Sequence, residues 1–150
     1  MSILPLLSKV FERILSNVIY SHVSGAIVDE QHGFVKHRSC ATNLAVLMKH
    51  AYDAIDDRDQ LDVIYTDYSK AFDRVDHALL LYKLRFYGIH QNILTWLGCY
   101  LSNRRQRVLL NGVESSWCRV TSGVPQGSIL APLSFVLYIN DMPKKVSIIC

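Results

Sequence analysis

The chain has 150 residues, of which 50% are hydrophobic, and a net charge of +3 from 16 basic and 13 acidic side chains. This length is typical of a single domain with a buried core, and the hydrophobic content excludes an intrinsically disordered protein. The longest apolar stretch, residues 129–139, is too short to cross a bilayer, and no basic region of a secretory signal opens the chain. We therefore expect a soluble intracellular protein without a membrane partner, in the nucleus or the cytoplasm.

The four cysteines lie far apart and contain no pair at the spacing of a zinc site or a redox motif: Cys40, Cys99, Cys118 and Cys150. The six histidines are scattered as well. We therefore expect free thiols, as in an intracellular protein, rather than a disulfide framework.

The first part of the chain predicts two helices separated by a loop. Apolar residues recur at steps of three and four over residues 5–23, which is typical of an amphipathic helix. Residues 25–40 have no such stripe and predict an extended loop. A second helix is expected over 41–57, followed by a buried β-strand at 61–66. The apolar side chains of this second helix are expected to face the core: Leu44, Leu47, Met48, Ala51 and Ile55.

Two more helices follow the predicted strand. Asp76 is an N-cap candidate for a helix that ends at Gly88, and another helix is expected over about 90–101.

A hairpin and a last helix complete the pattern. In RQRVLLNGVESSWCRV, residues 105–120, the pair Asn111–Gly112 predicts the tight turn of a β-hairpin. A loop rich in glycine and proline then leads into an apolar helix from about Ser128 to Asn140. The mixture predicts an α+β domain in which helices pack on a small antiparallel sheet.

Asp67 ends the apolar run of VIYTDYSKAFDRVDH, residues 63–77. A carboxylate fixed at the tip of a buried strand can bind Mg²⁺, which prefers hard oxygen ligands and leaves part of its shell to water and phosphate. An ordinary strand end explains the same residue. Asp73 and Asp76 are better explained by the start of a helix, where acidic side chains cap backbone N–H groups.

Two other stretches suggest contacts with phosphate. TSGVPQGSILAP at 121–132 places small residues before a helix N-terminus, which suits an anion or nucleotide platform, although an ordinary loop explains it equally well. SNRRQRV at 102–108 places three arginines within four positions, which either hold phosphates or form a solvated turn.

Two of these segments, in this order, resemble the palm of a reverse transcriptase from non-LTR retrotransposons: YTDYSKAFDRVDH at 65–77 and SGVPQGSILAPLSFVLYIND at 122–141. Three more segments resemble the same family: LLSKVFERIL at 6–15, QHGFVKHRSC at 31–40 and YLSNRRQRVLLNG at 100–112. The resemblance covers nearly the whole chain. It implies a partial right-hand polymerase, with part of the fingers over residues 1–60 and an incomplete palm over 61–150.

The resemblance implies roles for three residues of the first palm motif. Asp67 would be catalytic and would bind two Mg²⁺ ions, and the backbone carbonyl of Tyr68 would be a ligand of one of them. Phe72 would stack under the incoming sugar and exclude a 2′-hydroxyl, which favours deoxynucleotides. Without the resemblance, Phe72 would be interpreted as a core aromatic.

The resemblance also implies residues that bind the nucleotide. Gln126 and Gly127 would help to hold the incoming nucleotide and the template base. Arg38 would contact the triphosphate or the template backbone, with Lys36 as a weaker companion. Val35 stands where relatives often have an arginine, so one basic contact is expected to be missing.

The implied reaction is attack by a DNA primer 3′-hydroxyl on the α-phosphate of a deoxynucleoside triphosphate, directed by an RNA template and supported by two Mg²⁺ ions. Arg104, Arg105 and Arg107 are weaker candidates for contacts with the nucleic-acid backbone. No protein partner is predicted.

The 150 residues also depart from the family because they do not contain its Ala-Asp-Asp element, which supplies the remaining metal carboxylates. Asp141 belongs to a different pattern and is not expected to replace it. We therefore expect a fragment, a truncated gene model or a decayed transposon remnant that does not polymerise DNA alone. The alternatives are a non-catalytic nucleic-acid-binding or interaction module, and an unrelated metal-dependent phosphotransferase, which would leave SGVPQGS unexplained.

Overall fold

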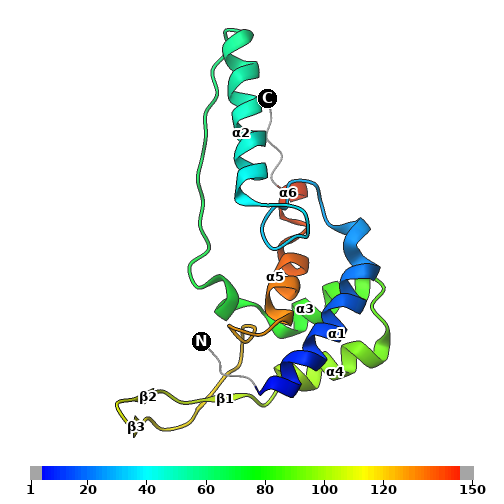
Figure 1. Cartoon of the computed structure of the whole chain (residues 1–150), viewed down its shortest axis with the longest axis vertical. Coiled ribbons are helices and arrows are strands. Elements are labelled where there is room, and N and C mark those ends of the chain that lie inside the picture. Colours follow the sequence, from blue (N-terminus) through cyan, green and yellow to red (C-terminus); the bar gives the residue numbers. More distant parts are fainter. Residues whose placement is uncertain (1–4, 146–150) are drawn as a thin grey trace.

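The computed structural model describes residues 5–145, and its centre is a core of four helices. The helix α3 packs against α4 and α5, and α1 packs against α5 from another side (Figure 1). We call this set the helical core: α1 (Leu6–Val23), α3 (His77–Phe86), α4 (Gln91–Leu101) and α5 (Leu130–Ile139).

The helix α5 is the most deeply buried of the four, and its sequence explains why. It is apolar on all sides, which is typical of a helix surrounded by others rather than of a surface helix. Val136 and Leu137 are completely buried, and Leu130 is 1% exposed. The predicted helix from about Ser128 to Asn140 is thus confirmed, with Leu130 as its first residue.

The helix α1 forms over the predicted residues but buries a different face from its apolar stripe. Its buried residues are Glu12, Ile19 and Val23. Most of the stripe faces solvent, and its exposed members are Leu7, Val10, Phe11, Ile14 and Val18. Phe11 nevertheless meets the edge of Trp96 of α4, with ring centroids 5.2 Å apart, and Leu15 packs against the core. The predicted helix is therefore confirmed, although its apolar stripe does not coincide with its buried face.

The helix α2 (Cys40–Asp56) stands away from the helical core, and residues 57–70 run back beside it (Figure 1). We call α2 and residues 57–70 the arm. None of the α2 residues is buried, so the prediction that its apolar side chains face a core is wrong: Leu44, Met48 and Ile55 are 57%, 42% and 69% exposed. Ser39 caps this helix and forms a capping box with Thr42.

The predicted strand at 61–66 is wrong. Residues 59–68 have no regular secondary structure, and residues 57–70 are all exposed. A β-strand needs a hydrogen-bonded neighbour, and no strand of the described residues lies beside this segment. Its apolar residues therefore remain in water, with Ile64 87% and Tyr65 82% exposed.

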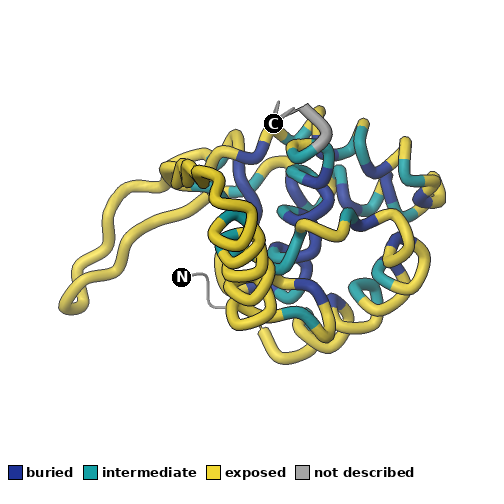
Figure 2. Tube along the Cα trace, turned by 90° about the horizontal axis from the view of Figure 1, so that it is seen from above, coloured by how far each residue is buried: buried dark blue, intermediate teal, exposed yellow. Residues whose placement is uncertain are grey.

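The predicted hairpin is confirmed. Its base pairs β1 (Arg105–Gln106) with β4 (Cys118–Arg119), and its tip pairs β2 (Leu109–Leu110) with β3 (Val113–Glu114). Asn111 and Gly112 both have positive φ, at 50° and 80°, as a two-residue primed turn requires. All four strands are exposed and project from the molecule (Figures 1 and 2).

The composition of the fold is therefore mixed, with helices and small antiparallel sheets, as expected. The helices pack chiefly on one another, however, and not on a sheet as predicted, because the strand pairs are two residues long and lie outside the core. Figure 2 shows buried residues concentrated in the helical core, while the arm and the hairpin are almost entirely exposed.

Three short helices complete the described chain: η1 (Ser24–Ala26), η2 (Ala71–Arg74) and α6 (Met142–Lys145). Asp76 caps α3 as predicted, since its side chain accepts from Leu79 N at 2.7 Å. The described cysteines are free thiols, whereas Cys150 lies outside the described residues. Within residues 5–145, no helix combines the length and apolar character that a membrane span requires.

Candidate functional site

The two segments predicted to carry the chemistry lie against each other. The loop at 121–127 contacts the turn at 71–75 through backbone hydrogen bonds from Val124 N to Phe72 O and from Gly123 N to Val75 O, both 2.8 Å. Two side chains of the loop add to this contact. Ser122 Oγ donates to Asp73 O at 2.8 Å, and Gln126 Nε2 donates to Asp73 Oδ1 at 3.1 Å.

Gly123 permits this close approach. A Cβ at this position would lie 2.7 Å from Asp73 Cα, Asp73 O and Phe72 O, which are backbone atoms that cannot rotate away. Its φ of +81° also favours glycine. Both geometric demands explain why a glycine stands at this point of the loop.

Phe72 is half-buried between aromatic residues from two other segments. Its ring stacks on Phe135 of α5, with centroids 4.8 Å apart, and meets the edge of Phe34 at 5.9 Å. The aromatic contact anchors the 71–75 turn on the helical core. Phe72 thus has the packing role of a core aromatic, and its predicted role beneath a sugar is not tested by this geometry.

Asp67 and Tyr68 line a cavity of about 650 Å³ beside the end of α5. Asp67 is exposed and belongs to the irregular segment rather than to the tip of a strand. Tyr68 packs edge-on against Phe135 and donates a hydrogen bond to Met142 Sδ at 2.7 Å.

Asp141 lines the same cavity as Asp67, which the sequence did not suggest. Lys83 Nζ lies 2.5 Å from Asp141 Oδ1 and 2.6 Å from the carbonyl oxygen of Tyr138. This ammonium group neutralises Asp141 and ties α3 to the end of α5.

The described residues do not make up a complete metal site. Among residues 5–145, no group of three histidine, cysteine, aspartate or glutamate side chains is placed to hold a metal ion. Asp67 and Asp141 share a cavity, but one of them is engaged by Lys83. The donor set therefore does not fit a divalent ion by itself.

Gln126 and Gly127 form the exposed end of the 121–127 loop. Gln126 is directed to the 71–75 turn by its hydrogen bond to Asp73, and Gly127 has a φ of 97°, in the region that favours glycine. Asp73, expected to act only at a helix start, is thus also the partner of a predicted nucleotide-binding residue.

Arg38 is occupied in holding its own loop together. Its guanidinium donates to the carbonyl oxygens of Val28, Asp29 and Gln31 at 2.7–3.0 Å and pairs with the Asp29 carboxylate at 2.8 Å. Lys36 is exposed, with its Nζ 4.6 Å from the centre of the Tyr20 ring. Both lie in the predicted extended loop, and Arg38 has a structural role that the sequence did not reveal.

The three arginines of the hairpin differ in their surroundings. Arg107 is paired with Glu114 and lies over the Trp117 ring at 4.7 Å. Arg104 is half-buried and donates to Gly123 O at 3.1 Å, and burial lowers the pKa of its guanidinium. Arg105 and Arg104 line a second cavity of about 440 Å³, which Arg107 does not line.

Comparisons with known proteins identify the family of the chain. The reverse transcriptase (RNA-dependent DNA polymerase) family matches residues 1–149. The chain belongs to the reverse transcriptase family. It is 33% identical over 151 residues to a probable RNA-directed DNA polymerase from transposon X-element of Drosophila melanogaster.

Two more relatives from Drosophila melanogaster are similar to this reverse transcriptase chain. The probable RNA-directed DNA polymerase from transposon BS is 32% identical over 150 residues, and the RNA-directed DNA polymerase from mobile element jockey is 33% identical over 144 residues. Each alignment covers 95% of this chain and 16% of the relative, so the chain spans about one sixth of the length of these relatives. The resemblance to non-LTR retrotransposon polymerases is thereby confirmed.

Glu12 is a residue that the sequence interpretation missed in this reverse transcriptase chain. It is 1% exposed, and its carboxylate accepts from Tyr100 Oη at 2.8 Å and from Ile129 N at 2.7 Å. Glu12 thus joins α1, α4 and the start of α5. Burial raises the pKa of its partner Tyr100. The available signal was its position, since Glu12 shares a helical face with Ile19 and Val23.

Asn140 was missed for a similar reason. Its side chain is buried, donates to Ala26 O at 2.8 Å and to Tyr87 Oη at 3.0 Å, and accepts from Val28 N at 2.9 Å. It fixes the loop that carries Arg38 to the end of α5. A polar residue that ends an apolar helix was its only signal in the sequence.

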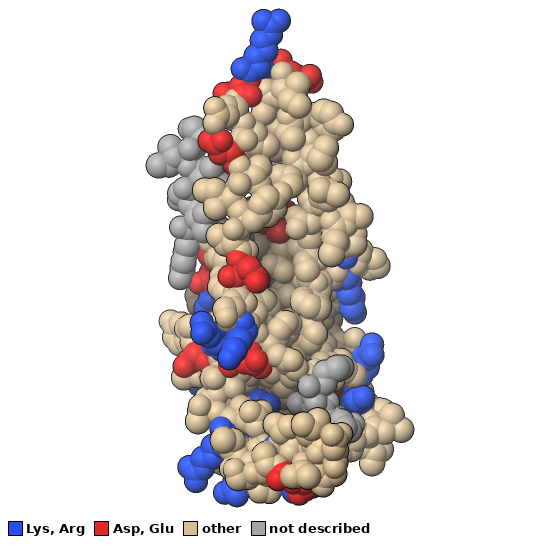
Figure 3. All heavy atoms as spheres, turned by 90° about the vertical axis from the view of Figure 1, so that its left-hand side faces the viewer, with Lys and Arg blue, Asp and Glu red and all other residues tan. Residues whose placement is uncertain are grey.

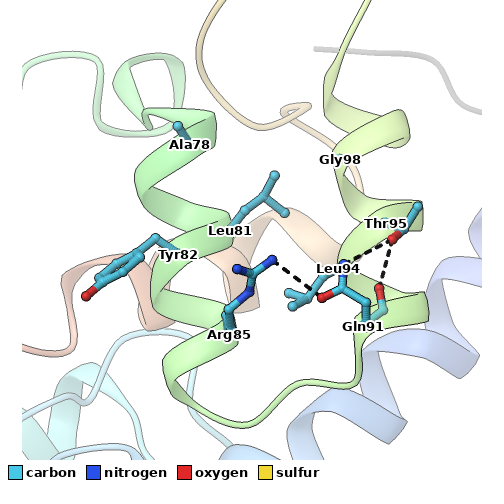
Figure 4. Close-up of a pocket in the computed structure, with 8 residues that line it drawn as sticks. All are labelled: Ala78, Leu81, Tyr82, Arg85, Gln91, Leu94, Thr95 and Gly98. Carbon is cyan, nitrogen blue, oxygen red and sulfur yellow. Dashed lines mark hydrogen bonds between the residues drawn. The ribbon is translucent and has the colours of Figure 1, made fainter.

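One pocket of the reverse transcriptase chain lies outside the predicted site. Figure 4 shows it between α3 and α4, with Arg85 directed at Gln91 and Gln91 at Thr95. None of its lining residues belongs to the 71–75 turn or to the 121–127 loop. Arg85, Gln91 and Thr95 are hydrogen-bonded to one another, and the pocket is separate from the candidate site.

Proposed function

We propose that this chain forms part of the fingers, residues 1–60, and of the palm, residues 61–150, of a right-hand reverse transcriptase. The complete enzyme would transfer a deoxynucleotide to a DNA primer 3′-hydroxyl on an RNA template, with two Mg²⁺ ions. The observation that supports this most strongly is the contact between the 71–75 turn and the 121–127 loop, four hydrogen bonds of 2.8–3.1 Å. It brings together the two motifs on which the family resemblance rests.

In this proposal Asp67 is the catalytic carboxylate and a metal ligand, and Tyr68 adds its backbone carbonyl. Asp67 lies in an exposed segment without regular secondary structure. The backbone of this segment would have to adopt a fixed position when the remaining metal ligands are present. The ligands of the described residues do not complete the site, so the 150-residue chain by itself is expected not to polymerise DNA.

Phe72, Gln126 and Gly127 would bind the incoming nucleotide. Their placement supports this, since Phe72 and Gln126 are joined through the turn residue Asp73, whose carboxylate accepts from Gln126. A nucleotide bound along this contact would have one aromatic face and one amide within reach. Arg38 would bind phosphates only if it exchanged part of its loop contacts for the ligand. Lys36 is exposed and could reach a phosphate without such an exchange.

A chimeric polymerase tests the proposal. This chain would replace the aligned residues of the RNA-directed DNA polymerase from mobile element jockey, to which it is 33% identical. We expect template-dependent incorporation of deoxynucleotides that Asp67→Asn abolishes, while the control Asp59→Asn, in the same exposed arm, retains it. Incorporation by the Asp67→Asn chimera equal to that of the parent chimera would contradict the catalytic role.

The isolated chain supplies the second test. Primer extension with Mg²⁺ should give no product, and the same chain should still bind an RNA–DNA primer–template. Extension that Asp67→Ala abolishes would overturn the expectation of inactivity. Binding without any activity of the chimera would favour the alternative, a non-catalytic nucleic-acid-binding module.

A further inference from the structure

The base of the hairpin places two arginines directly opposite each other. Arg105 of β1 and Arg119 of β4 are register partners in an antiparallel pair, so their side chains leave the ribbon on the same face. Like charges in this position are destabilising unless another group neutralises them. Among the described residues, no carboxylate lies within ion-pair distance of either arginine.

A third cationic group and several hydrogen-bond donors surround this pair. Arg104, Arg105 and Arg119 line one cavity of about 440 Å³, together with His77, Asn103 and Thr121. Arg104 is likewise without a carboxylate partner among the described residues. Figure 3 views the molecule from the side toward which the hairpin projects, and basic side chains lie at both sides of its lower part, with acidic side chains among them.

The cavity adjoins the contact between the two predicted motifs. His77 Nε2 and Arg104 Nη1 both donate to Gly123 O, at 2.8 and 3.1 Å, and Gly123 N donates to Val75 O at 2.8 Å. Anything bound beside Arg104 would therefore lie next to the loop that carries Gln126. This position suits a nucleic-acid strand that runs toward the candidate site.

We propose that the cavity binds a phosphate of a nucleic-acid backbone through Arg104, Arg105 and Arg119. The assignment of the ligand as nucleic acid rests on the proposed function, whereas the anion site rests on the unneutralised arginines. Guanidinium groups match phosphate geometry with paired N–H donors. The proposal divides the arginine cluster of the sequence: Arg107 is engaged by Glu114 and Trp117, and Arg119, from the other strand, completes the site.

Fluorescence anisotropy with a labelled single-stranded RNA at several KCl concentrations tests the proposal. We expect Arg105→Gln and Arg119→Gln each to weaken binding about fivefold to tenfold and to lower the slope of log affinity against log salt by about one unit. The matched control, Arg107→Gln in the same hairpin, should change the affinity by less than about twofold. An equal loss in all three variants, or unchanged slopes, would overturn the proposal.

Thermal unfolding separates a binding role from a structural one. Because Arg105 and Arg119 repel each other, each glutamine variant should unfold at the same temperature as the parent chain or at a higher one. Arg119→Lys, which keeps the charge but loses the paired N–H donors, should restore part of the affinity. A lowered unfolding temperature together with no recovery in Arg119→Lys would mean that the arginines support the hairpin rather than bind phosphate.

Competition distinguishes the source of the phosphate. A deoxynucleoside triphosphate should displace the labelled RNA poorly, whereas unlabelled RNA should displace it fully; efficient displacement by the triphosphate would assign the cavity to free nucleotides and overturn the backbone assignment. The outcome is independent of polymerase activity. If the chimera is active and the arginine variants bind RNA as well as the parent chain, this inference alone is refuted. If the chimera is inactive and the arginine variants lose RNA affinity as expected, the catalytic proposal alone is refuted.

Discussion

The helices α1 and α2 have similar amphipathic sequences, yet they belong to regions that behave differently. The helix α1 contributes Ile19 and Val23 to the helical core, whereas α2, in the arm, buries no residue. Amphipathic spacing therefore determined that both segments are helical but did not determine whether either has something to pack against. Stability should accordingly reside in the helical core, with the arm contributing little.

The largest contrast is expected from removing a leucine in each region. Leu137 is completely buried in α5, so Leu137→Ala should lower the free energy of unfolding by about 4 kcal/mol through lost burial and a residual cavity. Leu44 in α2 is 57% exposed, and Leu44→Ala should cost less than about 0.5 kcal/mol. Urea denaturation measures both. Comparable losses would mean that the arm is packed against the core in solution.

Glu12 sharpens the comparison within the helical core. Glu12→Ala leaves Tyr100 Oη and Ile129 N without their buried partner and should cost about 3 kcal/mol. Glu12→Gln keeps only one acceptor oxygen and should lie between that variant and the parent chain. The exposed neighbour Arg13→Ala is the control and should have little effect. If the urea midpoint of Glu12→Ala equals that of Arg13→Ala, the carboxylate does not connect the three helices.

Gly123 and Gly112 have nearly the same positive φ, but one lies in a packed turn and the other in an open one. Gly123→Ala adds a Cβ 2.7 Å from backbone atoms and should cost about 3 kcal/mol, from the strained φ and the clash together. At Gly112, with φ +80°, a Cβ meets nothing within 4 Å, so Gly112→Ala should cost only the conformational term of about 1 kcal/mol. Equal changes in thermal unfolding would show that the 121–127 loop does not press on the 71–75 turn.

The smallest expected effect concerns the two helix caps. Asp76→Ala removes the cap of α3 and should lower the global free energy of unfolding by about 1 kcal/mol. Ser39→Ala removes the cap of α2 and should speed amide hydrogen exchange in the arm without moving the urea midpoint. A midpoint shift in Ser39→Ala as large as that in Asp76→Ala would indicate that both regions unfold as one unit.

Local signals predicted most of the helices, because capping, helical period and turn chemistry act over a few residues. The Asp76 cap, the Asn111–Gly112 turn and the apolar helix α5 are confirmed for this reason. The prediction of a strand at 61–66 was wrong because a β-strand needs a hydrogen-bonded neighbour, which the sequence of the segment itself cannot supply. The apolar stripe of α1 does not reveal which side of the helix is buried, because a distant helix, α5, covers another side.

The candidate site divides in the same way. The family was readable in the sequence, and the match over residues 1–149 confirms it. The roles of the individual site residues stay predictions. The pairing of Gln126 with Asp73 was not readable, since the two residues are 53 positions apart in the chain. The loop role of Arg38 and the pairing of Arg107 with Glu114 were not readable either, since both depend on how a loop and a hairpin fold back on themselves.

The sequence by itself determined the family, the helices and the motifs, because these depend on local residue order. The tertiary structure alone decided that the arm is exposed, that Glu12 and Asn140 connect the helical core, and that Arg119 lies opposite Arg105. The physical reason is that burial, hydrogen-bond partners and charge neutralisation depend on which distant segments meet.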